Sequence, residues 1–207
     1  TLLKKQKIGL EIGGSLYQSH FIDYINVDAK PQTLRLENAF PSKVKYFRLG
    51  VVNRKNNENI KAIRVELNQQ TVLDTVLKLN PNYHLTGNNK TYFQIETHQV
   101  LNRRRNFSYP TSGSFLEISL RQRFFIEDGE NANSRIQLFY SKYIPISKKS
   151  IYSFGLISQY MYTKSISTKE NIALGFNKYI RGFDYYVIDG QSLVSLKQNL
   201  NTELFSN

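Results

Sequence analysis

The chain has 207 residues, of which 28 are Lys or Arg and 16 are Asp or Glu, so its formal charge is +12. It contains no Cys and three His, which excludes disulfides, thiolate zinc sites and cysteine nucleophiles. Its apolar runs are short, as at residues 124–126, whereas a transmembrane helix needs about 20 apolar residues. Transmembrane β-strands are not excluded, because they need only about ten residues of alternating character.

Alternation of apolar and polar residues with a period of two dominates the first half of the chain, as expected of strands with two different faces. It predicts strands over residues 59–69 and 91–101 and weaker ones over 7–16, 44–52 and 73–85. Residues 17–42 predict no clear element. In the strand at 59–69, the apolar face is Ile63, Val65 and Leu67, and the polar face is Arg64, Glu66 and Asn68.

The second half continues the alternation, most clearly at residues 114–126, where one face is apolar and the other carries Glu117, Arg121 and Arg123. Further strands are predicted over three segments, residues 135–144, 150–162 and 191–204. Clusters of Gly, Asn, Pro and Ser predict connections between strands. These connections are residues 53–59, 85–90, 102–113, 127–133 and 147–149, and a much longer one at about 163–190.

About nine consecutive strands with mostly short links predict an all-β, antiparallel meander with no boundary between domains. The strands are longer than the five or six residues usual in soluble sandwiches. Aromatic residues often fall near strand ends, as at Tyr143, Tyr152 and Tyr162, which is typical of the aromatic girdles of outer-membrane barrels. A membrane barrel keeps charges on one face because that face lines a wet lumen, but a soluble sandwich also has a polar face, so alternation alone leaves both open.

The long connection contains the tetrad Ile180, Arg181, Gly182 and Phe183, followed by Asp189, Gly190 and Gln191 at the start of the next strand. This segment resembles the signature of the bacterial surface antigen family, the BamA/TamA-type outer-membrane insertases and their two-partner-secretion relatives. In that family a [VI]-R-G-[FY] tetrad lies at the tip of the sixth extracellular loop, which folds back into the barrel. A looser match at residues 109–113, with Tyr109, Pro110 and Gly113, resembles the periplasmic turn that precedes a long strand.

The resemblance implies that the whole chain, residues 1–207, is part of a sixteen-stranded transmembrane barrel in the bacterial outer membrane, with a loop at about 163–190 folding inward. It implies that Arg181 points into the lumen and pairs with Glu203, with Gly182 permitting a tight turn and Phe183 packing on the inner wall. It further implies assistance in the insertion or translocation of polypeptides rather than catalysis, with no cofactor or metal. Its implied partners are outer-membrane lipids, nascent outer-membrane proteins and accessory periplasmic or lipoprotein subunits, and no nucleic acid.

Two other classes of protein remain as alternatives. One is a passive outer-membrane pore or structural barrel in which the tetrad is incidental. The other is a soluble, basic RNA-binding sheet, since residues 181–188 partly match an RNA-recognition signature, although Asp184 stands where Gly or Ala is wanted. The basic residues at 103–105 and 148–149 are expected in periplasmic turns and those at 54–55 on the opposite side, where they either attract lipid phosphates or are simply solvated.

Overall fold

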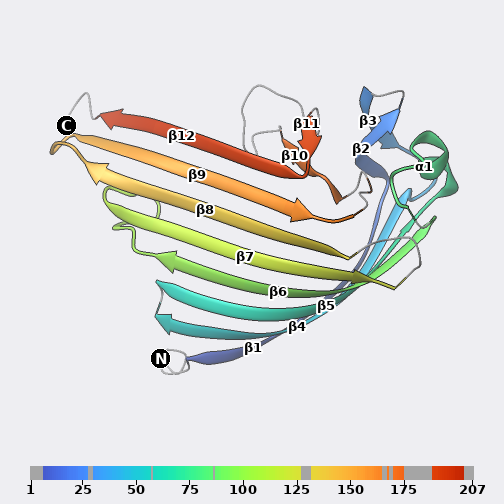
Figure 1. Cartoon of the computed structure of the whole chain (residues 1–207), viewed down its shortest axis with the longest axis horizontal. Helices are drawn as coiled ribbons and strands as arrows, with labels where there is room; N and C mark the ends of the chain where they lie inside the picture. The colour runs from blue at the N-terminus through green and yellow to red at the C-terminus, as the bar shows by residue number, and fades with distance from the viewer. Residues whose placement is uncertain are drawn as a thin grey trace.

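A computed structural model describes residues 7–27, 30–56, 58–85, 87–126, 132–164, 167, 170–174 and 188–202. Within these ranges the chain forms strands and one short helix (Figure 1). The strands are β1 (Ile8–Ser19), β2 (Phe21–Val27), β3 (Lys30–Arg35), β4 (Ser42–Asn56), β5 (Asn59–Val72), β6 (Asn89–Asn102), β7 (Gly113–Phe125), β8 (Asn133–Pro145), β9 (Ser150–Tyr162), β10 (Ile172–Leu174), β11 (Ile188–Gly190) and β12 (Ser192–Thr202), and the helix is α1 (Asp74–Leu79).

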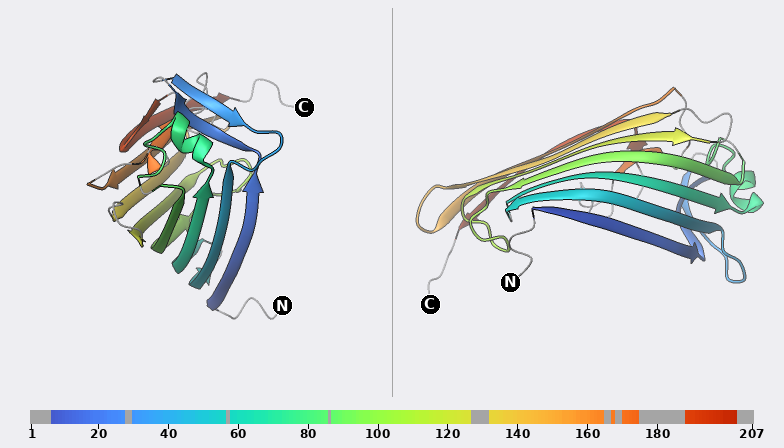
Figure 2. Two further views of the ribbon diagram at one scale, coloured as in Figure 1. Left: turned by 90° about the vertical axis from the view of Figure 1, so that its right-hand side faces the viewer. Right: turned by 90° about the horizontal axis from the view of Figure 1, so that it is seen from below.

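Eight long strands make one antiparallel sheet in the order β1-β4-β5-β6-β7-β8-β9-β12. Every neighbouring pair is antiparallel, so the predicted all-β meander is confirmed. Two small hairpins interrupt it: β2 and β3 pair between β1 and β4, and β10 and β11 pair between β9 and β12. The sheet is strongly curved, and its strands follow one another around an arc that opens between β1 and β12 (Figure 2). This is the shape of part of a barrel wall.

The strand predicted over residues 73–85 is wrong, because β5 ends at Val72 and α1 follows it. Leu73, Val76 and Leu77 have the spacing of one helical face rather than of a strand face. Fully buried Val76 packs with Ile22 of β2, Val72 and Tyr83, and the three leucines Leu34, Leu73 and Leu77 surround this cluster. The helix and the β2–β3 hairpin therefore form a small core at one end of the sheet, which we call the capped end. Within the described ranges, no helix combines the length and apolar content needed to cross a membrane.

The connections differ in length between the two ends of the sheet. At the end opposite the capped end, β4 joins β5 through residues 57–58, β6 joins β7 through residues 103–112, and β8 joins β9 through residues 146–149. The three longest connections between strands of the large sheet, residues 20–41, 73–88 and 163–191, lie at the capped end. Because residues 73–85 are not a strand, the turn at 53–59 lies at the same end as 102–113 and 147–149. The expectation that Arg54 and Lys55 lie on the opposite side is therefore wrong.

The two faces of the sheet differ in chemistry. The convex face carries large apolar side chains that the rest of the chain leaves open, such as Leu10, which is 82% exposed, and Val194, which is 75% exposed. A continuous apolar surface of this kind marks contact with a membrane or with another protein. Others exposed on it are Ile12, Phe47, Leu49, Val51, Ile63, Val65, Leu67, Phe93, Ile95, Leu120, Phe124, Ile136, Leu196 and Leu200. The concave face is polar and positions the candidate site.

Candidate functional site: the polar inner wall and its clasp

The strand register brings charged residues from four strands into one row on the concave face. Directly paired residues of neighbouring antiparallel strands lie on the same face. Glu11 of β1 pairs with Gly50 of β4, which pairs with Arg64 of β5. The row continues through Glu96 of β6 to Arg121 of β7. Acidic and basic side chains therefore alternate across the inner wall.

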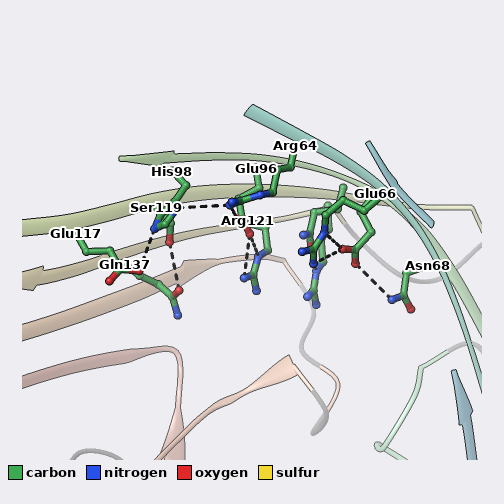
Figure 3. Close-up of polar contacts among 12 residues, drawn as sticks. Arg64, Glu66, Asn68, Glu96, His98, Glu117, Ser119, Arg121 and Gln137 are labelled. Carbon is green, nitrogen blue, oxygen red and sulfur yellow. Dashed lines mark hydrogen bonds and ion pairs between the residues drawn. The ribbon is translucent and has the colours of Figure 1, made fainter. Parts of the chain in front are cut away.

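These charges are joined directly (Figure 3). The Arg64 guanidinium donates from Nε to Glu11 Oε2 at 2.9 Å and from Nη1 to Glu96 Oε1 at 3.1 Å. Arg121 donates to the other Glu96 oxygen at 3.2 Å, so Glu96 bridges two arginines. In the adjoining row Arg48 donates to Glu66 Oε2 through both Nε, at 3.0 Å, and Nη2, at 2.8 Å. Such charge-assisted bonds hold long side chains flat against the wall.

Toward the end of the wall opposite the capped end, polar contacts continue without ion pairs between arginine and glutamate. His98 Nε2 lies 3.0 Å from Glu117 Oε1, and Ser119 Oγ donates to Gln137 Oε1 at 3.3 Å (Figure 3). Arg64 Nη1 lies 3.4 Å from His98 Nδ1, so the histidine connects the arginine row to Glu117. This wall suits the inside of a water-filled lumen, where charges remain partly solvated. In the described part of the chain, no group of three or more His, Asp or Glu residues is arranged to hold a metal ion.

A second charge cluster attaches the segment after β9 to the inner wall. Its centre is Glu170, which is 5% exposed and lies in the long connection. Its carboxylate pairs with Lys90 of β6, at 3.5 Å, and with Arg123 of β7. The Asn133 amide also donates to it, at 3.4 Å, and Arg135 of β8 donates to its backbone carbonyl. We call these five residues the Glu170 clasp.

The clasp is buried among aromatic rings. Lys90 is fully buried, and its ammonium lies 4.6 Å from the centre of the Phe125 ring and donates to Ser167 Oγ at 3.0 Å. The Arg123 guanidinium lies 4.5 Å from the centre of the Tyr92 ring. Cations on aromatic faces are stabilised by the ring quadrupole, which offsets part of the cost of removing them from water.

Apolar contacts continue the attachment beyond the clasp. Ile172 of β10, Met161 of β9 and Leu193 of β12 form a buried cluster with Ile157 at its margin. The Met161 amide also donates to the Gln191 carbonyl at 2.8 Å. The described parts of the long connection therefore return to the concave face at β6–β9 and β12.

The predicted loop-lock residues Ile180, Arg181, Gly182 and Phe183 lie outside the described residues, as does Glu203. Asp189 and Gly190 belong to β11, where they pair with Ala173 and Ile172 of β10. The Asn171 amide donates to Asp189 Oδ2 at 2.7 Å. Gln191 is the joint between β11 and β12, so the predicted start of the next strand is confirmed to within a residue.

The predicted turn at residues 109–113 is part of the connection between β6 and β7. Tyr109 is 81% exposed, and Pro110 follows it before the strand begins at Gly113. Gly113 has a φ of +98°, and a Cβ on it would lie 2.0 Å from the Arg103 carbonyl oxygen. Only glycine meets both conditions, so this part of the motif has a local structural reason.

The sequence-based interpretation missed the Glu170 clasp. Arg123 was placed on a polar strand face, but nothing near Glu170 in the sequence indicates a partner. Lys90 was assigned to a connection, and its burial depends on Phe125 and Ser167, which lie far along the chain. The long connection contains three acidic residues, Glu170, Asp184 and Asp189, so no signal in the sequence singles out Glu170.

The combination of an open, curved meander, an apolar convex face and a charged concave face defines a β-barrel wall of the outer-membrane type. The family model of the Omp85 superfamily domain matches residues 5–200, and the chain belongs to this superfamily. Its members are outer-membrane proteins that insert or translocate polypeptides. A comparison with curated proteins finds no match for this chain.

Proposed function

We propose that the chain is the loop-bearing part of an outer-membrane insertase or translocase barrel. In this proposal the segment at 163–190 folds into the lumen and is fixed there. The observation that carries it is the Glu170 clasp. The clasp attaches Glu170, which precedes the tetrad in the chain, to the concave wall. An extracellular loop directed outward would have no reason to bury a carboxylate against two basic side chains of the inner wall.

We further propose that Arg181 completes the attachment by pairing with Glu203 in the lumen. Arginine is the residue suited to this role, because its planar guanidinium can bind a carboxylate through two parallel hydrogen bonds. Family membership supports this assignment, and so does the position of the tetrad a few residues after β10. The clients of such a barrel are unfolded outer-membrane proteins, whose strands add to an open strand edge by β-augmentation.

The test uses the full-length protein in outer membranes and compares four variants: Arg181→Ala, Arg181→Lys, Glu203→Ala and the charge swap Arg181→Glu with Glu203→Arg. Each is scored for assembly of a client barrel and for the shift between unheated and boiled bands on a gel. The lumenal pair predicts that the first three lose assembly activity and that the swap restores part of it. Unchanged activity in all variants, with steady conductance in planar bilayers, would support a passive pore instead.

A further inference from the structure

The end of the sheet opposite the capped end is strongly basic. Its three turns, taken with the last residues of β4 and so covering residues 54–58, 103–112 and 146–149, contain seven basic residues and one acidic residue, Glu58. The seven are Arg54, Lys55, Arg103, Arg104, Arg105, Lys148 and Lys149. The connections at the capped end mix both signs, with Glu37, Asp74 and Asp189 beside Arg35, Lys78 and Lys164. We call the three turns together the basic end.

Two pockets at the basic end are lined by basic side chains. One of about 410 Å³ is lined by Lys7, Lys55 and Lys61 together with Asn53 and Asn59, so its polar lining consists of ammonium and amide groups. A smaller one of about 120 Å³ lies between the first two turns and brings Lys55 next to Arg103, with Glu58 as its acidic member. Neighbouring turns therefore share one electropositive surface.

The apolar convex face meets this surface directly. Along β5 the outward row runs from Leu67 through Val65 and Ile63 and ends in Lys61. Along β8 the outward row of Ile136, Leu138 and Tyr140 reaches Lys142, which is followed on the same face by exposed Ile144. Lysines in such positions keep their aliphatic stems on apolar surface while the ammonium group reaches the polar boundary.

Aromatic side chains mark the same boundary. Phe107 is 54% exposed and Tyr109 is 81% exposed, both in the turn that carries Arg103, Arg104 and Arg105. Aromatic residues of this kind settle at the level of the lipid headgroups. Since outer-membrane barrels have short periplasmic turns and longer extracellular loops, the short connections place the basic end at the periplasmic leaflet.

We propose that the basic end binds the headgroups of anionic phospholipids in the periplasmic leaflet, with the pocket of Lys7, Lys55 and Lys61 as the larger of its two sites. This inference rests on the proposed function, because it requires the barrel wall to stand in a bilayer. A lipid headgroup fits better than a free anion, because the charges follow the edge of the apolar face across three turns instead of converging on one point. Each basic residue at such a surface strengthens binding by about fivefold.

The experiment measures lipid retention by native mass spectrometry of the full-length protein in micelles that contain equal amounts of phosphatidylglycerol and phosphatidylcholine. The wild-type protein is expected to retain phosphatidylglycerol in at least about fivefold excess. The combined variant Arg103→Gln, Arg105→Gln, Lys148→Gln and Lys149→Gln removes four exposed charges and is expected to lose that excess. The variant Lys55→Gln with Lys61→Gln tests the pocket separately and is expected to lower the excess.

The matched control is Lys43→Gln with Lys45→Gln, which removes two exposed lysines at the capped end of β4 and is expected to leave the excess unchanged. An equal loss in this control would overturn the proposal, because it would reduce the effect to net charge. Removal of the excess by millimolar inorganic phosphate would also overturn it, in favour of a free-phosphate site. An intact gel shift with no preference for phosphatidylglycerol would reject this inference alone, whereas loss of the gel shift in the wild-type protein would reject the proposed barrel.

Discussion

Arg64 on β5 reaches across the intervening strand β4 to Glu11 on β1, with its Nε 2.9 Å from the Glu11 carboxylate. The residue of β4 between them is Gly50. A Cβ at Gly50 would lie 3.1 Å from Arg64 Cγ and 3.4 Å from Glu11 Cβ, so the absent side chain leaves the space that the guanidinium crosses. Three strands are thereby tied together by one arginine.

Substitution of Gly50 should break this connection. Gly50→Val is expected to displace the Arg64 side chain and lower the free energy of unfolding by about 1–3 kcal/mol, as overpacking does elsewhere. Gly13→Val is the control, because Gly13 lies on the same face of β1 with no atom within 4 Å of its Cβ position. Urea titration scored by the heat-modifiable gel band measures both, and equal midpoints would show that the crossing contributes no stability.

Removal of the Glu170 carboxylate should release the long connection from the wall. Glu170→Gln leaves buried Lys90 and half-buried Arg123 with a neutral partner, and breaking a buried ion pair in this way costs about 3 kcal/mol. Limited proteolysis should then cut within residues 163–190 at protease concentrations that leave the wild-type protein intact. Glu58→Gln, in an exposed turn, should behave as wild type. An uncut Glu170→Gln variant would contradict the clasp.

The turn before β7 should require glycine for two separable reasons. Gly113→Ala places a methyl group 2.0 Å from the Arg103 carbonyl and keeps an unfavourable φ, so we expect a loss of about 3 kcal/mol or more. Gly87→Ala, at a φ of +85° but with no atom within 4 Å, carries only the backbone strain, about 1 kcal/mol. Comparison of their urea midpoints separates the two effects, and equal losses would show that the close approach is irrelevant.

The assignment of the convex face to lipid can be tested at one residue. Val65→Arg puts a charge in the apolar face and should cost about 2–4 kcal/mol in a bilayer if that position is near the midplane. Ser119→Arg, which faces the lumen beside Gln137, should cost less than about 1 kcal/mol. Folding yield into vesicles measures the difference. Equal tolerance of both substitutions would mean that the apolar face does not contact lipid.

The sequence predicts most of the sheet because alternation is a local property. Consecutive residues such as Arg64 and Val65 lie on opposite faces of any strand. The polar and apolar faces can therefore be identified from the sequence alone. The strand predicted over 73–85 was wrong because Leu73, Val76 and Leu77 also fit a helix, and only their packing against Ile22 decides between the two. Contacts between side chains on different strands could not be predicted, because no local sequence pattern indicates that Arg64 lies two strands from Glu11.

The candidate site was predictable only in part for the same reason. The glycine at 113 could be assigned to a turn from its neighbours, and its φ confirms that glycine is needed there. The role of Glu170, in contrast, depends on its contacts with Lys90, Arg123 and Arg135, which lie on three different strands. The role of Arg181 stays a prediction, because it rests on a four-residue motif and on family membership.

The meander also constrains the order in which the structure can form. Five of the seven ladders of the large sheet join strands that are consecutive in the chain, so hairpins can assemble in sequence at a small entropic cost. The contact between Lys90 and Ser167 spans 77 residues and cannot form before β6 to β9 are in place. The clasp is therefore a late event in folding. Glu170→Gln should accelerate unfolding while leaving the rate of folding nearly unchanged.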